Sequence, residues 1–241
     1  MTSPPSSEDV PYWQVNIPVD QRTATCPDFL LNINAKDRGI ISTRQEDSAL
    51  MSWPEVRAVI AANQLQKFQR TPLALRRYLE YCWGLKEKYG SAVHFVLRER
   101  LHWTTEELAA RVSAEAATGH GSIPDFSDSS DVKILCNDWP YGLDERIVHL
   151  VVWTKFPLPE DPTTGDLTDD ARAAIEAYVQ QTFRAALPAD SVIWFKNWRS
   201  LKSVLLVEHF HVMLFDPPVE FVARITNGDV PLSKRLEGDG Q

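Results

Sequence analysis

The feature that most constrains the fold is the stretch from Val192 to Phe215, VIWFKNWRSLKSVLLVEHFHVMLF. Its two ends are rich in β-branched and aromatic residues, which favour strands, and a short polar connection separates them. We therefore expect strands at 192–196 and 204–214. A link this short joins antiparallel strands, because a parallel pair needs a longer crossover.

The second of these strands carries two histidines one residue apart, His209 and His211. Residues i and i+2 of a strand point to the same face, so Phe210 and Val212 point to the other face, toward the core. Two imidazoles on an exposed sheet face can act as a nucleophile with a supporting donor, as a general acid/base pair or as two metal ligands. The alternative is a pair of ordinary surface or hydrogen-bonded histidines.

The order of expected elements after residue 131 predicts an α+β domain. Strand-like runs at 131–138 and 146–156 are followed by a helix that Thr168 caps, then by the two strands above and a short last helix. Short links make consecutive strands antiparallel, and an antiparallel sheet with flanking helices belongs to the α+β class.

The chain before residue 131 is helical by pattern. Ser52–Glu55 and Thr104–Glu107 have the spacing of capping boxes, and Thr71-Pro72 opens a longer helix between them. A loop rich in Gly, Ser, Pro and Asp at 118–130 is the best candidate boundary. We therefore expect a disordered tail (1–10), an N-terminal helical segment (11–130), an α+β domain with the His-x-His strand (131–233) and a second tail (234–241).

The charge balance argues against a general nucleic-acid binder. The chain has 25 basic and 33 acidic side chains among 241 residues, a net charge of −8, whereas phosphate backbones require a basic stripe. A few local donors can still hold a small anionic ligand. No apolar run approaches the roughly 20 residues that span a bilayer, and the first residues lack the pattern of a secretory signal. We expect a cytoplasmic protein, with the nucleus as the alternative, and no membrane or nucleic-acid partner.

A metal site at the histidine pair would require a third ligand. Asp138 and His149 lie on other expected strands, but no second motif points to them. The three cysteines, Cys26, Cys82 and Cys136, are far apart and favour a reducing compartment. We predict no metal and no cofactor, and the sequence leaves the oligomeric state open.

Two further groups of polar and aromatic residues lie next to the expected sheet. Asn137 and Trp139 fall in the turn before the strand of His149, where Trp139 can stack on a flat ring such as a base or can cover the core edge. His149 by itself is typical of a core histidine. The link 196–203 presents cations and amides to phosphate oxygens, or is a solvated basic turn. Its candidate ligand-binding residues are Asn197, Arg199, Lys202 and Ser203, with Lys196 at its start.

The common nucleotide and hydrolase motifs are missing from the sequence: there is no GxGxxG, GxxxxGK[ST], HExxH or GxSxG. Basic residues of the long helical region alternate with glutamates, which indicates a solvated helix face. They are Arg76, Arg77, Lys86, Lys88, Arg98 and Arg100.

Several long strings resemble the fungal N-acetylglucosamine-induced protein family, which is defined by a domain of unknown function. They are ILCNDWPYGLDERIVHLVVWTKF, VIWFKNWRSLKSVLLVEHFHVML and ITNGDVPLS, with PYWQVNIP and RRYLEYCW in support. The resemblance covers roughly residues 11–233. It implies a fungal protein linked to the response to amino sugars, and it brings no established enzyme activity.

A second, more distant resemblance is to the histidine-triad superfamily of nucleotide hydrolases and transferases. His149 with Lys155, then Asn197, then His209-Phe210-His211 occur in the order of that superfamily. It implies that His211 is the nucleophile, that His209 supports it, and that Asn137 and Trp139 lie near the nucleoside. The chain departs from the pattern at Met213, where a third histidine is expected, and at Lys202-Ser203, where a Gly-Gln pair is expected.

These observations lead to three hypotheses about function. The first is a histidine-triad-like phosphoryl or nucleotidyl hydrolase or transferase acting on a nucleotide or nucleotide sugar, with His211 and His209 as catalytic residues. The second is a non-catalytic sensor that binds a nucleotide or sugar phosphate on the same face. The third is a structural partner-binding protein, which the eight tryptophans would serve if some are exposed.

Overall fold

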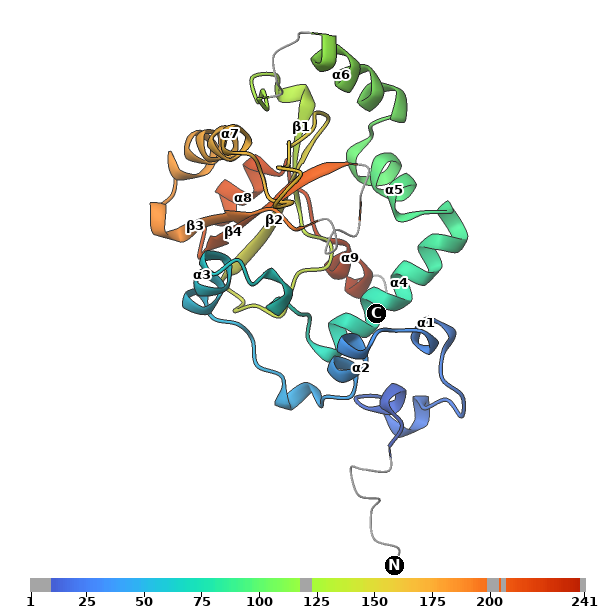
Figure 1. Ribbon diagram of the computed structural model, residues 1–241. Helices are drawn as coiled ribbons and strands as arrows, with labels where there is room; N and C mark the ends of the chain where they lie inside the picture. The colour runs from blue at the N-terminus through green and yellow to red at the C-terminus, as the bar shows by residue number, and fades with distance from the viewer. Residues whose placement is uncertain (1–9, 118–122, 199–203, 205–206, 239–241) are drawn as a thin grey trace, which may run out of the picture.

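The structure is a computed structural model that describes residues 10–117, 123–198, 204 and 207–238. A single sheet lies in the middle, with α7 and α8 on one side and α4 and α5 on the other (Figure 1). The helices are α1 Asp28–Leu31, α2 Ala35–Ile41, α3 Trp53–Ala61, α4 Pro72–Tyr89, α5 Ala92–Phe95, α6 Thr105–Ala117, α7 Asp169–Val179, α8 Val219–Ile225 and α9 Leu232–Gly238. The strands are β1 Val132–Cys136, β2 Ile147–Thr154, β3 Val192–Phe195 and β4 Glu208–Phe215.

The sheet has four strands in the order β1-β2-β4-β3, and every neighbouring pair is antiparallel. The two long strands, β2 and β4, are therefore central, and the two short strands lie at the edges. This arrangement, with helices flanking the sheet, confirms the predicted α+β class.

One face of the sheet is largely apolar. Phe210, Val212 and Leu214 of β4 point to it, because alternate residues of a strand share a face. They pack on the apolar stripe of α7, where Ile175 and Val179 are fully buried. This face holds the main core of the α+β part of the chain.

The opposite face is covered by the N-terminal helical segment in two separate apolar clusters. At one end α3 packs its Trp53 and Val56 on Phe195 and Met213. At the other end α4, α5 and the helical turn Val96–Leu101 pack on β1 and β2. The histidine-bearing face was expected to be exposed, and this is wrong, because helices from the first half of the chain lie across it.

The helix starts follow the predicted capping chemistry. The backbone N–H of Ser52 donates to Glu55 Oε2 (2.8 Å), and Thr104 and Glu107 satisfy each other's backbone N–H groups (2.7 and 3.1 Å). Gly90 ends α4 with φ of 74°, a left-handed conformation that glycine adopts without a steric penalty.

Two expected boundaries differ from the structure. β4 begins at Glu208 and not at residue 204; Val204 and Val207 instead pack in the cluster around α4 and α5. The chain after residue 234 was expected to be a tail, but α9 remains helical to Gly238. Residues 1–9 and 239–241, where the other tail predictions fall, lie outside the described residues. No helix in the described part of the chain is long and apolar enough to cross a membrane.

Candidate functional site

Three histidines lie on the covered face of the sheet, at the gap between its two apolar clusters. His209 and His211 share this face by alternation along β4, and His149 reaches it from β2. The register pairs Val151 with His211 and Met213 with His149, so the two imidazoles are diagonal neighbours. Their exposures are 4%, 6% and 5% for His209, His211 and His149. Met213, at the position expected for a third histidine, is fully buried in the cluster around α3.

Four side chains form a continuous buried hydrogen-bonded chain, which we call the imidazole relay. His149 Nε2 lies 3.0 Å from His211 Nδ1, and Asn197 Nδ2 lies 3.1 Å from His211 Nε2. At the other end Asn137 Nδ2 is 3.2 Å from the ring nitrogens of His149. The relay thus links Asn137 just after β1, both central strands, and Asn197 two residues past the end of β3.

Burial keeps both imidazoles of the relay neutral. Desolvation, together with a smaller contribution from the nearby Arg70 guanidinium, lowers the pKa of His149 to about 3. Desolvation also lowers the pKa of His211 well below its usual value, with the neighbouring histidines and Arg70 adding to the effect. Both rings are therefore uncharged at neutral pH, so neither can act as a general acid.

The surroundings of His209 differ from those of His211. Its Nδ1–H donates to the carbonyl oxygen of Val207 (2.9 Å), since a carbonyl can only accept. Its ring lies against Trp153, with centroids 4.5 Å apart.

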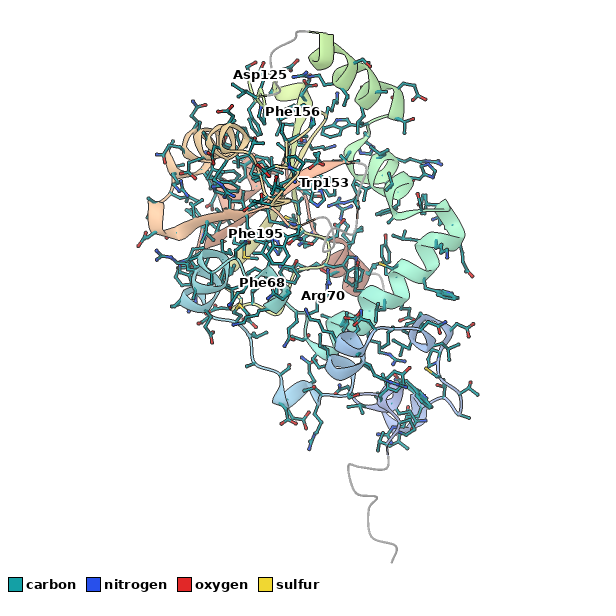
Figure 2. The ribbon with its side chains drawn as sticks, viewed as in Figure 1. Phe68, Arg70, Asp125, Trp153, Phe156 and Phe195 are labelled. Atoms are coloured by element: carbon teal, nitrogen blue, oxygen red, sulfur yellow. The ribbon has the colours of Figure 1, made fainter. Side chains whose placement is uncertain are left out.

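A cavity of about 400 Å³ lies against the histidine face. Figure 2 shows Phe68, Arg70, Phe195 and Trp153 around the space between the sheet and the helices that cover it. Aromatic side chains supply much of the wall, which is typical of pockets for small ligands. The aromatic residues of the lining are Phe68, Tyr78, Tyr81, Phe95, Trp139, Tyr141 and Trp153.

Arg70 is a cation of the cavity lining whose contacts in the described part of the chain are with a carbonyl oxygen and aromatic rings. Its Nε–H donates to the carbonyl oxygen of Trp139 (3.0 Å), and its guanidinium carbon lies 3.9 Å from the centre of the Tyr78 ring. Among the described residues no carboxylate lies within ion-pair distance of it.

A second buried polar group, which we call the charge cluster, lies at another wall of the same cavity. Its members are Arg100, Asp138, Asp229 and Arg235. Arg100 donates to both oxygens of Asp229 (2.8 Å each) and to Asp138 (2.9 Å), and Arg235 also donates to Asp229 (2.8 Å). The cluster joins the helical turn after α5 to the β1–β2 turn and to the segment before α9.

Five of the predicted site residues meet at the cavity: Asn137, Trp139, Asn197, His209 and His211 all line it. His149 lies directly behind His211 in the relay. Trp139 is 8% exposed and packs against Tyr81, with ring centroids 5.2 Å apart, so it covers the core edge while its remaining surface faces the cavity.

Of the predicted cationic residues, the structure describes Lys155 and Lys196, and neither lines the cavity. Lys155 pairs with Glu107 (3.6 Å) and lies 5.3 Å from the centre of the Trp103 ring. Lys196, at the start of the basic link, points away from the histidines and pairs with Glu160 and Glu208. Arg199, Lys202 and Ser203 lie outside the described residues.

Sequence reasoning missed the two arginines of the cavity. Arg100 was placed on a solvated helix face, and this is wrong, because it is 6% exposed and its charge is met by two aspartates. Arg70 stands alone just before the cap of α4, and no local pattern distinguishes it from a surface arginine. Among the described residues no three His, Cys, Asp or Glu side chains form a group that could hold a metal ion.

The fold and this covered histidine face define an α+β protein with a cavity between its sheet and the helices that cover it. Residues 52–215 match the family described as "Protein of unknown function (DUF3605)", and the chain belongs to that family. Its relatives include N-acetylglucosamine-induced protein 1 of Candida albicans, 31% identical over 185 residues that cover 73% of each chain. An uncharacterized protein of Saccharomyces cerevisiae is 28% identical over 76% of this chain and 88% of its own.

The fold also resembles a solved structure, the crystal structure of a protein called HTC1. The TM-score is 0.53 at 24% sequence identity, and the match covers 79% of this chain and 97% of the other. This likeness concerns the fold alone.

Proposed function

We propose that the cavity binds a small phosphate-bearing metabolite, a nucleotide or a sugar phosphate. The observation that carries the proposal is Arg70, a cavity-lining guanidinium with no carboxylate partner among the described residues. A guanidinium presents five N–H donors, and phosphate oxygens match its geometry. One donor of Arg70 is used by the Trp139 carbonyl, and an anionic group in the cavity would use others.

The aromatic walls suit the rest of such a ligand. The rings of Tyr81 and Trp139 pack at a tilt of 45°, and Trp153, which lies against His209, also lines the cavity. Aromatic faces hold a planar base by offset stacking or a sugar ring by contact with its apolar face. The name of the Candida albicans relative supports a link to amino sugars, and we propose an N-acetylated sugar phosphate among the candidate ligands.

A second candidate function is turnover of the ligand, as in a histidine-triad-like hydrolase or transferase. In that hypothesis His211 was the expected nucleophile, but both of its ring nitrogens are engaged within the relay. His209 is the other β4 imidazole of the cavity lining, and the Val207 carbonyl holds its Nδ1 proton, which orients the ring. Binding remains the first proposal, since Arg70 supports it without any assumption about a nucleophile.

The partner-binding hypothesis draws little support from the tryptophans. Among those of the described residues only Trp83 is largely exposed, at 46%. One exposed ring does not make an apolar patch of the size that marks a protein interface.

The test is calorimetric binding of AMP, UMP, N-acetylglucosamine 6-phosphate and inorganic phosphate to the wild type and to Arg70→Gln. We expect at least one of the phosphate esters to bind the wild type, and Arg70→Gln to weaken binding by about ten- to a hundredfold, the range for one lost hydrogen-bonded charge. The matched control is Lys67→Gln, which removes the same charge from an exposed neighbour and leaves binding unchanged.

If none of the four compounds binds the wild type, the proposal is wrong. Incubation of each bound compound, followed by phosphorus NMR, separates the two candidate functions. A product that forms with the wild type and not with His209→Ala would establish turnover.

A further inference from the structure

The imidazole relay has a direction, which the orientation of Asn137 sets. The backbone N–H of Trp139 donates to Asn137 Oδ1 (3.1 Å), and an N–H can donate only to the oxygen of a carboxamide. Asn137 Nδ2 therefore faces His149, where it must find an unprotonated ring nitrogen.

Nδ1 is the ring nitrogen of His149 that accepts from Asn137. If Nδ1 carried the proton, that N–H would be buried and, among the described residues, would have no acceptor. A buried donor without a partner costs about 1–3 kcal/mol. With Nδ1 as acceptor, the proton is on Nε2, which then donates to His211 Nδ1 at 3.0 Å.

The proton of His211 is then on Nε2 and requires an acceptor. The group opposite is the Asn197 carboxamide, whose Nδ2 lies 3.1 Å away while its buried Oδ1 has no partner among the described residues. A half turn of this carboxamide exchanges its two atoms, which have nearly the same shape. Oδ1 then accepts from His211, and every ring nitrogen of the relay is paired.

We infer that Asn137 and His149 are positioning residues which, through His211, turn the Asn197 carboxamide so that its Nδ2–H₂ group faces the cavity. Asn197 is 6% exposed and lines the same cavity as Arg70. After the half turn, the Nδ2–H₂ group takes the buried position of Oδ1, where no described residue accepts from it, so a ligand in the cavity would supply the acceptor beside the Arg70 guanidinium. Such a wall selects a ligand that brings hydrogen-bond acceptors, and phosphate oxygens are of this kind.

This inference deepens the proposed function and rests on it for the identity of the ligand, but the direction of the relay can be tested without any ligand. Long-range ¹H–¹⁵N correlation spectra at neutral pH report which ring nitrogen of a histidine carries the proton. We expect the Nε2–H tautomer for His149 and His211, and the Nδ1–H tautomer for His209, which donates to the Val207 carbonyl. A spectrum with His211 in the Nδ1–H form would overturn the inference.

Asn137→Asp tests the positioning role, because it replaces the Nδ2 donor by an acceptor of the same shape. His149 must then protonate Nδ1 to meet the new carboxylate, and the relay reverses. We expect His149 and His211 both to switch to the Nδ1–H tautomer while His209 stays unchanged. A merely structural Asn137 would leave the tautomers as they were.

The ligand test uses AMP with wild type and Asn197→Asp. The aspartate keeps an acceptor for His211 but replaces the donor that faces the cavity, so we expect AMP to bind about ten- to a hundredfold more weakly. Because the new charge also repels AMP, the side-chain amide resonances of wild-type Asn197 are followed as well, and we expect them to shift on addition of AMP.

The outcomes separate the two proposals. Binding of AMP with the Asn197 amide resonances unmoved would refute the donor subsite while leaving ligand binding intact. If AMP and the other phosphate compounds fail to bind at all, the proposed function is wrong, and the tautomer spectra still decide the direction of the relay.

Discussion

Two buried polar networks line the same cavity, and they start from neighbouring residues of one turn. Asn137 begins the imidazole relay, and Asp138 belongs to the charge cluster with Arg100, Asp229 and Arg235. The relay is uncharged at neutral pH, whereas the cluster is made of formal charges. The difference between them lies in how completely their hydrogen-bonding groups are used.

The charge cluster is closed. Both oxygens of Asp229 accept from Arg100, the backbone N–H of Cys136 donates to one of them, and Leu232 N–H donates to Asp138. The imidazole relay is open at one end, because Asn197 keeps one carboxamide atom without a partner among the described residues. A closed network holds elements together, and an open one offers a group to a ligand.

The largest expected effect on stability comes from removing Arg100 from the charge cluster. Arg100→Met removes the cation that two buried aspartates share, and we expect a loss of about 3–5 kcal/mol in the free energy of unfolding. Urea denaturation of the wild type and the variant measures it. The matched control is Arg98→Met on the same helical turn, whose side chain is 79% exposed and whose loss should change stability by less than about 1 kcal/mol.

A loss below about 1 kcal/mol for Arg100→Met would contradict the view that this cluster holds the helical segment on the sheet. It would mean that the aspartates are neutralised by protonation once the arginine is gone. Repeating the denaturation at higher pH, where protonation is harder, distinguishes this case.

The second expected effect concerns the free energy of unfolding, which should depend on pH with opposite sign in the two networks. Desolvation holds the pKa of folded His149 near 3, so below about pH 6.5 the unfolded chain takes up a proton that the folded chain does not. The contribution of the neutral His149 to the free energy of unfolding is therefore complete above about pH 6.5, and it is lost as the pH falls toward 3. At pH 5 the loss from His149 is about 2 kcal/mol, and His211, whose pKa is lowered in the same direction, adds to it.

The charge cluster responds in the other direction, because burial raises the pKa of the Asp138 carboxyl above its usual value. Acid therefore favours the folded state through this group. Urea denaturation between about pH 7 and 5 measures the sum of the two contributions. We expect the free energy of unfolding of the wild type to fall as the pH falls, and His149→Gln to show a smaller change of that free energy with pH. A His102→Gln variant, changed at an exposed site, should keep the full slope. Equal slopes in all three proteins would contradict a buried neutral relay.

The fold of the α+β part was predictable because its signals are local. β-branched and aromatic residues mark β2, aromatic and other apolar residues mark β4, and Thr168 caps α7 as expected, accepting from Ala171 N–H at 3.3 Å. The start of β4 was placed four residues early, since Val204 and Val207 are apolar for a different reason: they pack under α4 and α5. An apolar run does not reveal which partner buries it.

The candidate site was predictable only for the residues that the sheet itself positions. The two-residue period of a strand places His209 and His211 on one face, and the expected strands carry His149 and Asn197 to it. Arg70 and Arg100 meet that face through contacts between distant parts of the chain, and Arg100 Nη1 bonds Asp229, 129 residues away in sequence. No periodicity in the sequence indicates contacts between residues so far apart. The burial of the histidine face depends on these contacts, so it could not be predicted.

The smallest effect is expected at the outer edge of the closed network. Arg235 donates to the same oxygen of Asp229 as Arg100 does, at the same 2.8 Å, but its side chain is 45% exposed against 5% for Arg100. Water replaces the lost donor when Arg235 becomes Met, whereas no water replaces the donors of Arg100. We therefore expect Arg235→Met to cost less than about 1 kcal/mol in the same urea experiment.

This pair of variants tests whether burial, and not the identity of the partner, sets the energy of the cluster. Both arginines meet Asp229, so a model based on contacts alone predicts similar costs. A cost for Arg235→Met close to that of Arg100→Met would show that α9 is held as tightly as the helical turn after α5. A small cost would place the closed part of the network at Arg100, Asp138 and Asp229, next to the cavity wall, because these side chains are less accessible to water than Arg235.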